Sequence, residues 1–469
     1  MAKISGMKFI SVFLALGFCL ATVCAQSDST VLLTYEEYLE NILNYHPITK
    51  KADLRMTMAK AEMLGAKGNF DPVLGADWNQ KDFDDKLYYQ QYHAKLKIPT
   101  LYGIDVLGGY ENTDGAFINP ENNTDEFGLW HLGVEVNLLQ GLFVNERRTA
   151  IEQAKVFQNL AENERQIILN DLVYNASVAY LIWQQYEYFE EILIENKSIA
   201  DTYFQNTKQS FFGGEKTAMD TLEAFILSQD ATTLIQKNGM QLIKSRQNVE
   251  NFLWYNEAPV ALQENTKPED YKNEIWPKTQ VFDNLNLPNH PIISASMNKL
   301  SSVEIEQRLK REKLKPKFKI KYNQLLQTSQ TNVTPNFSIN DYKWGFDFSM
   351  PLLFRSERGA IQKGEVKIQE IQLDIQNKSN ELQNKIESSW EQQQLLQDQI
   401  ALLSQNVSSY KLLLDGENEK FNFGESSVFL LNKRQEKYIN GQLKLIESYI
   451  KQQIELLNFL YFSNQLVNR

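Results

Sequence analysis

The chain has 469 residues and a formal net charge of −11, with 12% aromatic and 23% charged side chains. This negative balance leaves no basic face of the kind that binds nucleic acid, so we expect no nucleic-acid partner. The two cysteines, Cys19 and Cys24, both lie in the first 25 residues. A disulfide-stabilised fold and a cysteine nucleophile are therefore excluded for the rest of the chain.

Residues 1–25 are typical of a signal peptide. Lys3 and Lys8 supply the positive charge, Phe9–Val23 forms the apolar segment, and a small-residue cleavage site follows. We therefore expect an exported protein, without a lipid anchor because no small residue precedes either cysteine. Beyond this segment no run of roughly 18 apolar residues predicts a membrane helix, so any contact with a membrane interior would require strands.

A short helix, about Thr34–Gly68, is predicted to precede a group of strands. In the strands the hydrophobic period changes to two, and apolar side chains alternate with polar or charged ones. The strand segments contain Leu74–Trp78, Tyr92–Ile98, Tyr102–Tyr110 and Trp130–Leu138. This alternation fits a transmembrane barrel with lipid outside and water inside, or a half-exposed sheet in a soluble domain.

Long helices follow from the placement of proline. The chain has 12 prolines, but none lies between residues 121 and 258 and none after Pro351. Because a proline inside a helix costs about 3 kcal/mol, both reaches predict helices. The first, Phe143 to about Lys208, would be roughly 100 Å long. It ends at the turn of Gly213 and Gly214, and a second helix returns over about Thr217–Trp254.

The same order of elements occurs again after a polar, proline-bearing segment, residues 258–288. The expected elements are a short helix at about Ala295–Lys313, strands at Lys317–Tyr322 and Lys343–Met350, a long helix that ends near Gly424, and a returning helix at Ser427–Phe462.

Local sequence also predicts a duplication. Phe143–Ile151 recurs as Phe354–Ile361, and His46-Pro47 recurs as His290-Pro291. We therefore predict a mainly α fold with a membrane β-barrel, built from two tandem repeats of short helix, β-hairpin and long antiparallel helical hairpin. The expected divisions are a signal peptide (1–25), a first repeat (26–257) with an inserted extra hairpin (80–126), a linker (258–288) and a second repeat (289–469).

One chain alone does not supply a channel wall. Two hairpins give four strands, or six if the inserted hairpin joins the sheet, whereas a barrel of about eight strands is already filled by its own side chains. Open strand edges cannot face lipid. We therefore expect several copies to share one barrel. Three copies would give twelve strands or eighteen, and the sequence leaves that choice open.

Specific segments resemble the TolC family of outer-membrane efflux proteins. They are Leu352-Leu-Phe followed by Glu357-Arg-Gly-Ala-Ile361, and Phe421-Asn-Phe-Gly-Glu-Ser-Ser427 followed by Leu430-Leu-Asn-Lys433. With the doubled layout, the resemblance covers nearly the whole predicted mature chain. It implies a homotrimer in the cell outer membrane, with a β-barrel that continues as a helical tunnel through the periplasm.

The resemblance also implies a function. Such proteins are passive exit ducts of tripartite efflux or type I secretion systems, and they dock at their helical tips with a periplasmic adaptor and an inner-membrane pump. The partners would be other copies of the chain, the adaptor, the pump and outer-membrane lipid, with no cofactor. The cargo and the class of pump stay open.

Candidate gating positions follow from the family's tunnel mouth, counted from the tip glycines. From Gly424 the count gives Phe421, Ser426, Leu430 and Lys433, of which only the aromatic residue matches the family pattern. From Gly214 it gives Asp220 and Glu223. Our hypothesis is that Asp220 and Glu223 combine with Lys433 in an interhelical ion-pair latch. The alternative is that these charges only solvate a helix face. The candidate adaptor-docking residues at the tips are Phe212, Gly213, Gly214, Phe423 and Gly424.

No constellation of residues indicates catalysis. The histidines are scattered, and His46 and His290 precede equivalent prolines, which favours a repeated turn over a metal site. Gly213-Gly214 lacks the following Gly-Lys-Ser/Thr of a phosphate loop. We therefore expect no enzyme activity, cofactor or metal. The main alternative function is a periplasmic coiled-coil adaptor or tether without a barrel, and an exported enzyme with a helical domain is a weaker one.

Overall fold

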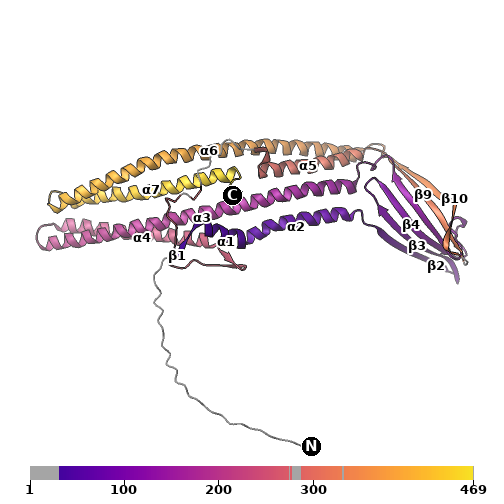
Figure 1. Cartoon of the computed structure of the whole chain (residues 1–469), viewed down its shortest axis with the longest axis horizontal. Helices are drawn as coiled ribbons and strands as arrows, with labels where there is room; N and C mark the ends of the chain where they lie inside the picture. The colour runs from indigo at the N-terminus through magenta and orange to yellow at the C-terminus, as the bar shows by residue number, and fades with distance from the viewer. Residues whose placement is uncertain (1–30, 274, 277–286, 330–331, 468–469) are drawn as a thin grey trace, which may run out of the picture.

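The computed structural model describes residues 31–273, 275–276, 287–329 and 332–467. The predicted signal peptide lies outside the described residues, as do residues 274 and 277–286 of the predicted linker. Within the described part, the molecule is long and narrow, with strands at one end and the turns of two helical hairpins at the other (Figure 1).

The helices agree closely with the predicted order. They are α1 (Tyr35–Tyr45), α2 (Pro47–Gly68), α3 (Glu146–Phe212), α4 (Ala218–Glu250), α5 (Pro291–Glu312), α6 (Arg355–Asn422) and α7 (Val428–Phe462), with short 3-10 turns at Pro120–Asn122 and Leu287–Asn289. The two longest, α3 and α6, have 67 and 68 residues, so each is about 100 Å long. Helix α4 returns along α3, and α7 returns along α6 (Figure 1).

Both long helices end in the same backbone motif. Gly214 and Gly424 adopt positive φ angles of 82° and 77°, a region that glycine enters without strain. The next residue of each turn closes a six-residue loop: Glu215 N–H donates to Ser210 O (2.9 Å), and Glu425 N–H donates to Lys420 O (2.8 Å). The predicted glycine turns are therefore true helix stops, and they occupy equivalent places in the two repeats.

The expected single helix at 34–68 is wrong in one respect, because it is two helices. Proline disfavours helical backbone in the residue before it and has no N–H to donate, so the chain breaks at His46-Pro47. His46 has extended backbone (φ −67°, ψ 136°) and caps α2: its Nδ1 accepts a hydrogen bond from Ile48 N–H (3.2 Å). His290 caps α5 in the same way through Ile292 N–H (3.3 Å).

The strands form one six-stranded antiparallel sheet in the order β10-β9-β5-β4-β3-β2. The members are β2 (Val73–Phe83), β3 (Lys86–Pro99), β4 (Ile104–Asp114), β5 (Leu129–Asn137), β9 (Lys317–Ser329) and β10 (Asn332–Ser349). The inserted hairpin supplies β3 and β4, which lie between β2 and β5 and belong to the sheet. Among the described strands, β2 and β10 each keep one edge without a partner.

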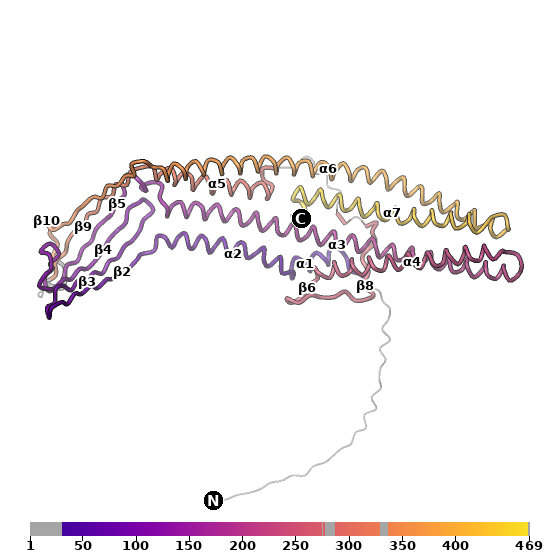
Figure 2. The backbone as a smooth tube through the Cα atoms, turned by 180° about the vertical axis from the view of Figure 1, so that it is seen from behind, coloured from indigo at the N-terminus to yellow at the C-terminus, as the bar shows by residue number. Residues whose placement is uncertain are grey.

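The main hydrophobic core lies at mid-length, where α1 and the ends of α4 and α7 meet α3. Trp183, Tyr180 and Trp276 are buried there. Short strands cross this region: β1 (Val31–Leu33) pairs with β8 (Thr266–Pro268), while β6 (Trp254–Tyr255) pairs with β7 (Ala258–Pro259). Figure 2 shows β6 and β8 beside the helices. The described part of the predicted linker therefore packs on the helices of both repeats.

In the described chain, no helix combines the length and the apolar character needed to cross a membrane.

The histidine caps predict acid sensitivity. Burial lowers the pKa of His290 from 6.5 to about 4 and also lowers the pKa of His46. As the pH falls below 6.5 the unfolded chain binds protons before the folded chain does, and protonation of Nδ1 would remove the cap. The His290 contribution, about 3 kcal/mol, is therefore complete above pH 6.5 and is lost as the pH falls toward 4.

Urea unfolding in detergent, followed by circular dichroism at several pH values, measures this effect. The matched variant is His290→Asn, which keeps a capping oxygen and does not titrate. Its unfolding free energy should depend less on pH between 6.5 and 4 than that of the parent protein. Equal slopes for the two proteins would contradict the prediction.

Candidate functional site

The two faces of the sheet differ in chemistry, as the alternation of side chains along a strand requires. The first, which we call the aromatic face, carries large apolar side chains that are exposed in the single chain, among them Trp78, Trp130, Trp344, Phe346 and Phe348. The second, which we call the charged face, carries a ladder of ionisable side chains. Its ion-paired members are Asp77, His93, Lys95, Lys97, Asp105, Glu111, His131, Glu135, Lys319, Lys321 and Asp347.

Two buried carboxylates hold the charged face together. Asp105 accepts hydrogen bonds from Nη1 and Nη2 of Arg147 (2.7 and 3.1 Å), and Lys97 Nζ lies 2.8 Å from its carboxylate. Glu135 Oε1 lies 2.9 Å from Lys319 Nζ and 3.6 Å from Lys97 Nζ. A carboxylate removed from water is tolerated only when it is well paired, so these contacts fix the relative positions of four strands and one helix.

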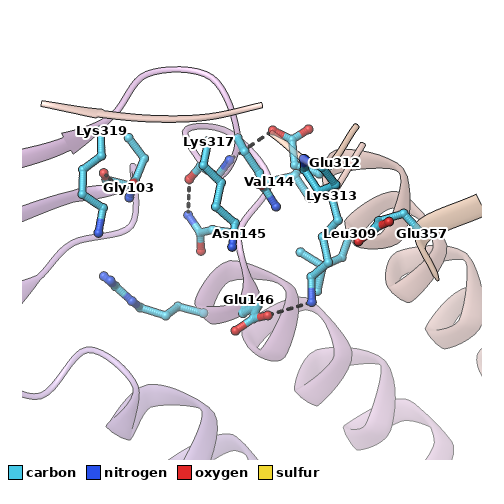
Figure 3. Close-up of a pocket in the computed structure, with 15 residues that line it drawn as sticks. Gly103, Val144, Asn145, Glu146, Leu309, Glu312, Lys313, Lys317, Lys319 and Glu357 are labelled. Carbon is cyan, nitrogen blue, oxygen red and sulfur yellow. Dashed lines mark hydrogen bonds and ion pairs between the residues drawn. The ribbon is translucent and has the colours of Figure 1, made fainter. Parts of the chain in front are cut away.

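The junction of sheet and helices continues this network. Glu146, in the first turn of α3, forms an ion pair with Lys313 at the end of α5 (2.9 Å). The hydrogen bond from Lys313 holds the pKa of the Glu146 carboxyl below its ordinary value. Beside this pair lies a cleft of about 490 Å³. Figure 3 shows Lys317 and Lys319 of β9 on one side of the cleft, with Glu146 and Lys313 on the other.

At the other end of the molecule, the two hairpin tips of the chain touch each other. Lys216 Nζ lies 4.6 Å from the centre of the Phe421 ring, and the Tyr203 ring meets Phe421 edge-on at 5.8 Å. The Tyr203 hydroxyl also hydrogen-bonds to Asn418 Oδ1. Phe421, the one residue that matched the family's latch pattern, therefore joins the second tip to the first.

Asp220 lies in a helix cap. Its backbone N–H donates to Thr217 Oγ1 (3.2 Å), and its Oδ2 accepts from Thr217 N–H (2.9 Å). This reciprocal pair is a capping box at the start of α4. Hydrogen bonds from the backbone and side chain of Thr217 hold the pKa of the Asp220 carboxyl below its ordinary value. The Asp220 carboxylate is thus engaged within its own turn.

Lys433 pairs within its own helix, with Glu436 at 2.8 Å. Glu223 and Lys433 line one cleft between α4 and α7, yet no ion pair joins Lys433 to Glu223 or Asp220 in the described chain. Ser426 donates to Glu417 (2.5 Å), and Leu430 is partly exposed in the first turn of α7. The fold of the single chain therefore brings Glu223 and Lys433 into the same cleft without forming the hypothesised ion-pair latch.

The predicted docking residues lie at the far ends of the hairpins. Phe212 and Phe423 are 76% and 81% exposed, so each tip presents an apolar ring to its surroundings. Gly213, Gly214 and Gly424 form the turns that carry these rings. Within the described residues, no group of three or more His, Cys, Asp or Glu side chains is placed to hold a metal ion.

Sequence reasoning missed the ion-pair network of the charged face and the contact of Lys216 with Phe421. The alternating Lys317, Lys319 and Lys321 were a visible signal for a charged strand face. Their carboxylate partner Glu135, however, lies far away in the chain, and only the register of β5 against β9 brings them together.

The contact between the tips yields a prediction. Phe421→Ala removes a cation–π and an edge-to-face aromatic contact, together worth about 1–2 kcal/mol. Opening of the tips should then become roughly tenfold more frequent. Hydrogen–deuterium exchange of the α3–α4 turn measures this, with Phe423→Ala as the control because Phe423 is mostly exposed. Equal exchange in the two variants would show that Phe421 does not join the tips.

No protein-family model and no curated protein sequence matches the chain. Its fold does match solved structures. The CmeC outer membrane channel of Campylobacter jejuni aligns with a TM-score of 0.65 and 11% identity, over 92% of this chain and 85% of that one. The outer membrane protein VceC of Vibrio cholerae aligns with a TM-score of 0.66 and 13% identity, over 92% and 95%.

A third match is the open state of the MtrE outer membrane channel of Neisseria gonorrhoeae. It aligns with a TM-score of 0.60 and 12% identity, over 92% of this chain and 89% of that one. Each of these alignments covers 92% of the chain, and they confirm the predicted fold of long helices and β-hairpins. The chain therefore has the fold of the TolC-family outer-membrane channels.

Proposed function

We propose that the protein is a passive exit duct of the outer membrane. In this proposal three copies form one channel, and a periplasmic adaptor and an inner-membrane pump deliver the cargo to it. The observation that carries the proposal is the six-stranded sheet, which has an aromatic face, a charged face and two unpaired edges. Such a sheet has the chemistry of a barrel wall, with lipid on one side and water on the other.

The unpaired edges support assembly. In lipid, an unpaired backbone N–H or C=O costs several kcal/mol, so β2 of one copy would pair with β10 of the next. Six strands from each of three copies would give an eighteen-stranded wall, wide enough to enclose water. The fold shared with outer-membrane channels and the resemblance in sequence both favour three copies.

The helical part supports a role beyond the membrane. Helices of about 100 Å are far longer than a membrane or a single globular core needs, and they extend away from the sheet (Figure 1). The exposed rings of Phe212 and Phe423 at their ends would offer an apolar surface to an adaptor. We therefore assign the docking function to the tips around Gly213, Gly214 and Gly424.

The mouth of the tunnel is assigned to the cleft that holds Glu223 and Lys433. Closing a latch would require Lys433 to leave Glu436, its partner in the protomer, for Glu223 or Asp220 of a neighbouring helix. Charge reversal by Lys433→Glu should therefore raise the open probability and shift the ion preference toward cations in planar bilayer recordings. Lys437→Glu, on the same helix, is the control. A variant that conducts exactly as the parent does would end the latch hypothesis.

The alternative of a periplasmic adaptor or tether explains the hairpins but not the sheet. A soluble tether has no need for exposed Trp78, Trp344 and Phe346 on one continuous face. Cell fractionation separates the two functions, because a tether would appear in the salt-washable fraction and a duct would remain with the outer membrane.

A pair of variants tests the membrane assignment of the aromatic face. Phe346→Arg places a guanidinium on the aromatic face, where lipid contact would make it unfavourable by about 2–4 kcal/mol. Gly345→Arg, at nearly the same depth, places it on the charged face, where the added Cβ meets open space. Phe346→Arg should reduce the carbonate-resistant trimer in the outer membrane, and Gly345→Arg should leave it nearly unchanged. Equal membrane levels of the two variants would count against the duct.

A further inference from the structure

We propose that the helix end of the charged face forms a layer that favours the passage of anions. This inference rests on the proposed duct and adds to it a substrate class, namely solutes with carboxylate or phosphate groups. The cations concerned, which we call the lysine layer, are Lys97, Arg147, Lys317, Lys319 and Lys321. Three carboxylates accompany them, namely Asp105, Glu135 and Asp347.

Burial decides which of these charges meet water. The side chains of Asp105 and Glu135 are only 2% and 8% exposed, whereas those of Lys97, Lys319 and Lys321 are between 36% and 44% exposed. The carboxylates therefore lie beneath the ammonium groups and hold them in place. A solute that approaches the charged face would meet the cations first.

Lys317 adds a cation that no carboxylate neutralises by direct contact. It is exposed at the start of β9, beside the junction cleft, and it forms no ion pair with any described carboxylate (Figure 3). Three acidic residues line the same cleft, namely Glu146, Glu312 and Glu357. Glu146 is paired with Lys313 and Glu312 with Lys315. Because side chains alternate along a strand, Lys317, Lys319 and Lys321 share one face and concentrate positive charge there.

The position of the layer suits a selective element. The five cations lie at the end of the sheet that adjoins the helices, where a trimer would repeat them three times around the passage from tunnel to barrel. Acidic residues such as Asp125 lie near the opposite ends of the strands. Along β9 the separation from Lys319 to Gln327, the partner of Asp125, is about 26 Å. This separation exceeds the Debye length of about 8 Å at physiological salt, so the charge of Asp125 is screened from the lysine layer and does not offset it.

A purely structural role is the competing explanation for these lysines. Lys97 and Lys319 do neutralise buried carboxylates, and their loss would leave Asp105 or Glu135 unpaired. Lys317 has no such role, and Lys321 is the more distant partner of Glu135, at 3.5 Å against 2.9 Å for Lys319. Changing Lys317 and Lys321 therefore tests selectivity while leaving the closest pairs intact.

The experiment measures reversal potentials of the purified full-length protein in a planar bilayer under a potassium chloride gradient. For Lys317→Gln with Lys321→Gln, the ratio of chloride to potassium permeability should fall about twofold or more, and the fall should be larger at low salt. The arginine pair, Lys317→Arg with Lys321→Arg, keeps the charges and should keep the ratio. Lys86→Gln, at the distal end of β3, removes one positive charge elsewhere on the sheet, as Lys317→Gln alone does within the layer, and should also keep the ratio.

The outcomes separate this inference from the duct itself. A folded protein that inserts but does not conduct would overturn the duct. A conducting protein whose permeability ratio is unchanged by the double glutamine variant would overturn the lysine layer alone. If the double variant does not insert, Lys317→Gln decides the matter, because Lys317 lacks a carboxylate partner whose loss could unfold the sheet.

Discussion

The arrangement of the sheet depends on the ion pairs that two buried carboxylates, Asp105 and Glu135, form with neighbouring lysine and arginine side chains. Each would be strongly unfavourable alone in a site that excludes water, and each is compensated by two or three cations. Those cations come from β3, β9 and the first turn of α3. The same contacts therefore set the strand register, attach the sheet to the helices and assign the polar side chains to a single face.

The side chains that alternate with these polar residues are largely apolar, and they stay exposed in the single chain. The outer edges of β2 and β10 likewise leave backbone N–H and C=O groups without a strand partner among the described residues. A protomer with two unlike faces and two free edges satisfies its chemistry only beside other copies and at a boundary between water and an apolar phase. The proposed trimer in the outer membrane meets both requirements at once.

Much of the fold could be predicted because its signals are local. Missing prolines, a change of period from 3.5 to 2 and glycine stops gave α4 as about Thr217–Trp254 against Ala218–Glu250 in the structure. The pairing of strands could not be predicted, because the alternation of apolar and polar side chains within β3 does not indicate which strands lie beside it. The site was harder to predict. Lys433 forms its ion pair with Glu436 of its own helix, not with the predicted partners on α4. Asp220 was predicted to be a charge at the tunnel mouth, although its spacing of three from Thr217 is that of a capping box.

The inserted hairpin shows why the two repeats are not interchangeable. It supplies Lys97 and Asp105, and Asp105 in turn holds Arg147 of α3. Without β3 and β4, β2 would have to pair with β5 directly, and Arg147 would lose its carboxylate while Glu135 lost Lys97. The second repeat contributes the opposite half of the network through Lys319 and Lys321, which reach back to Glu135 of the first. The hairpin thus widens the sheet and brings part of its own charge compensation with it, through Lys97 and Asp105.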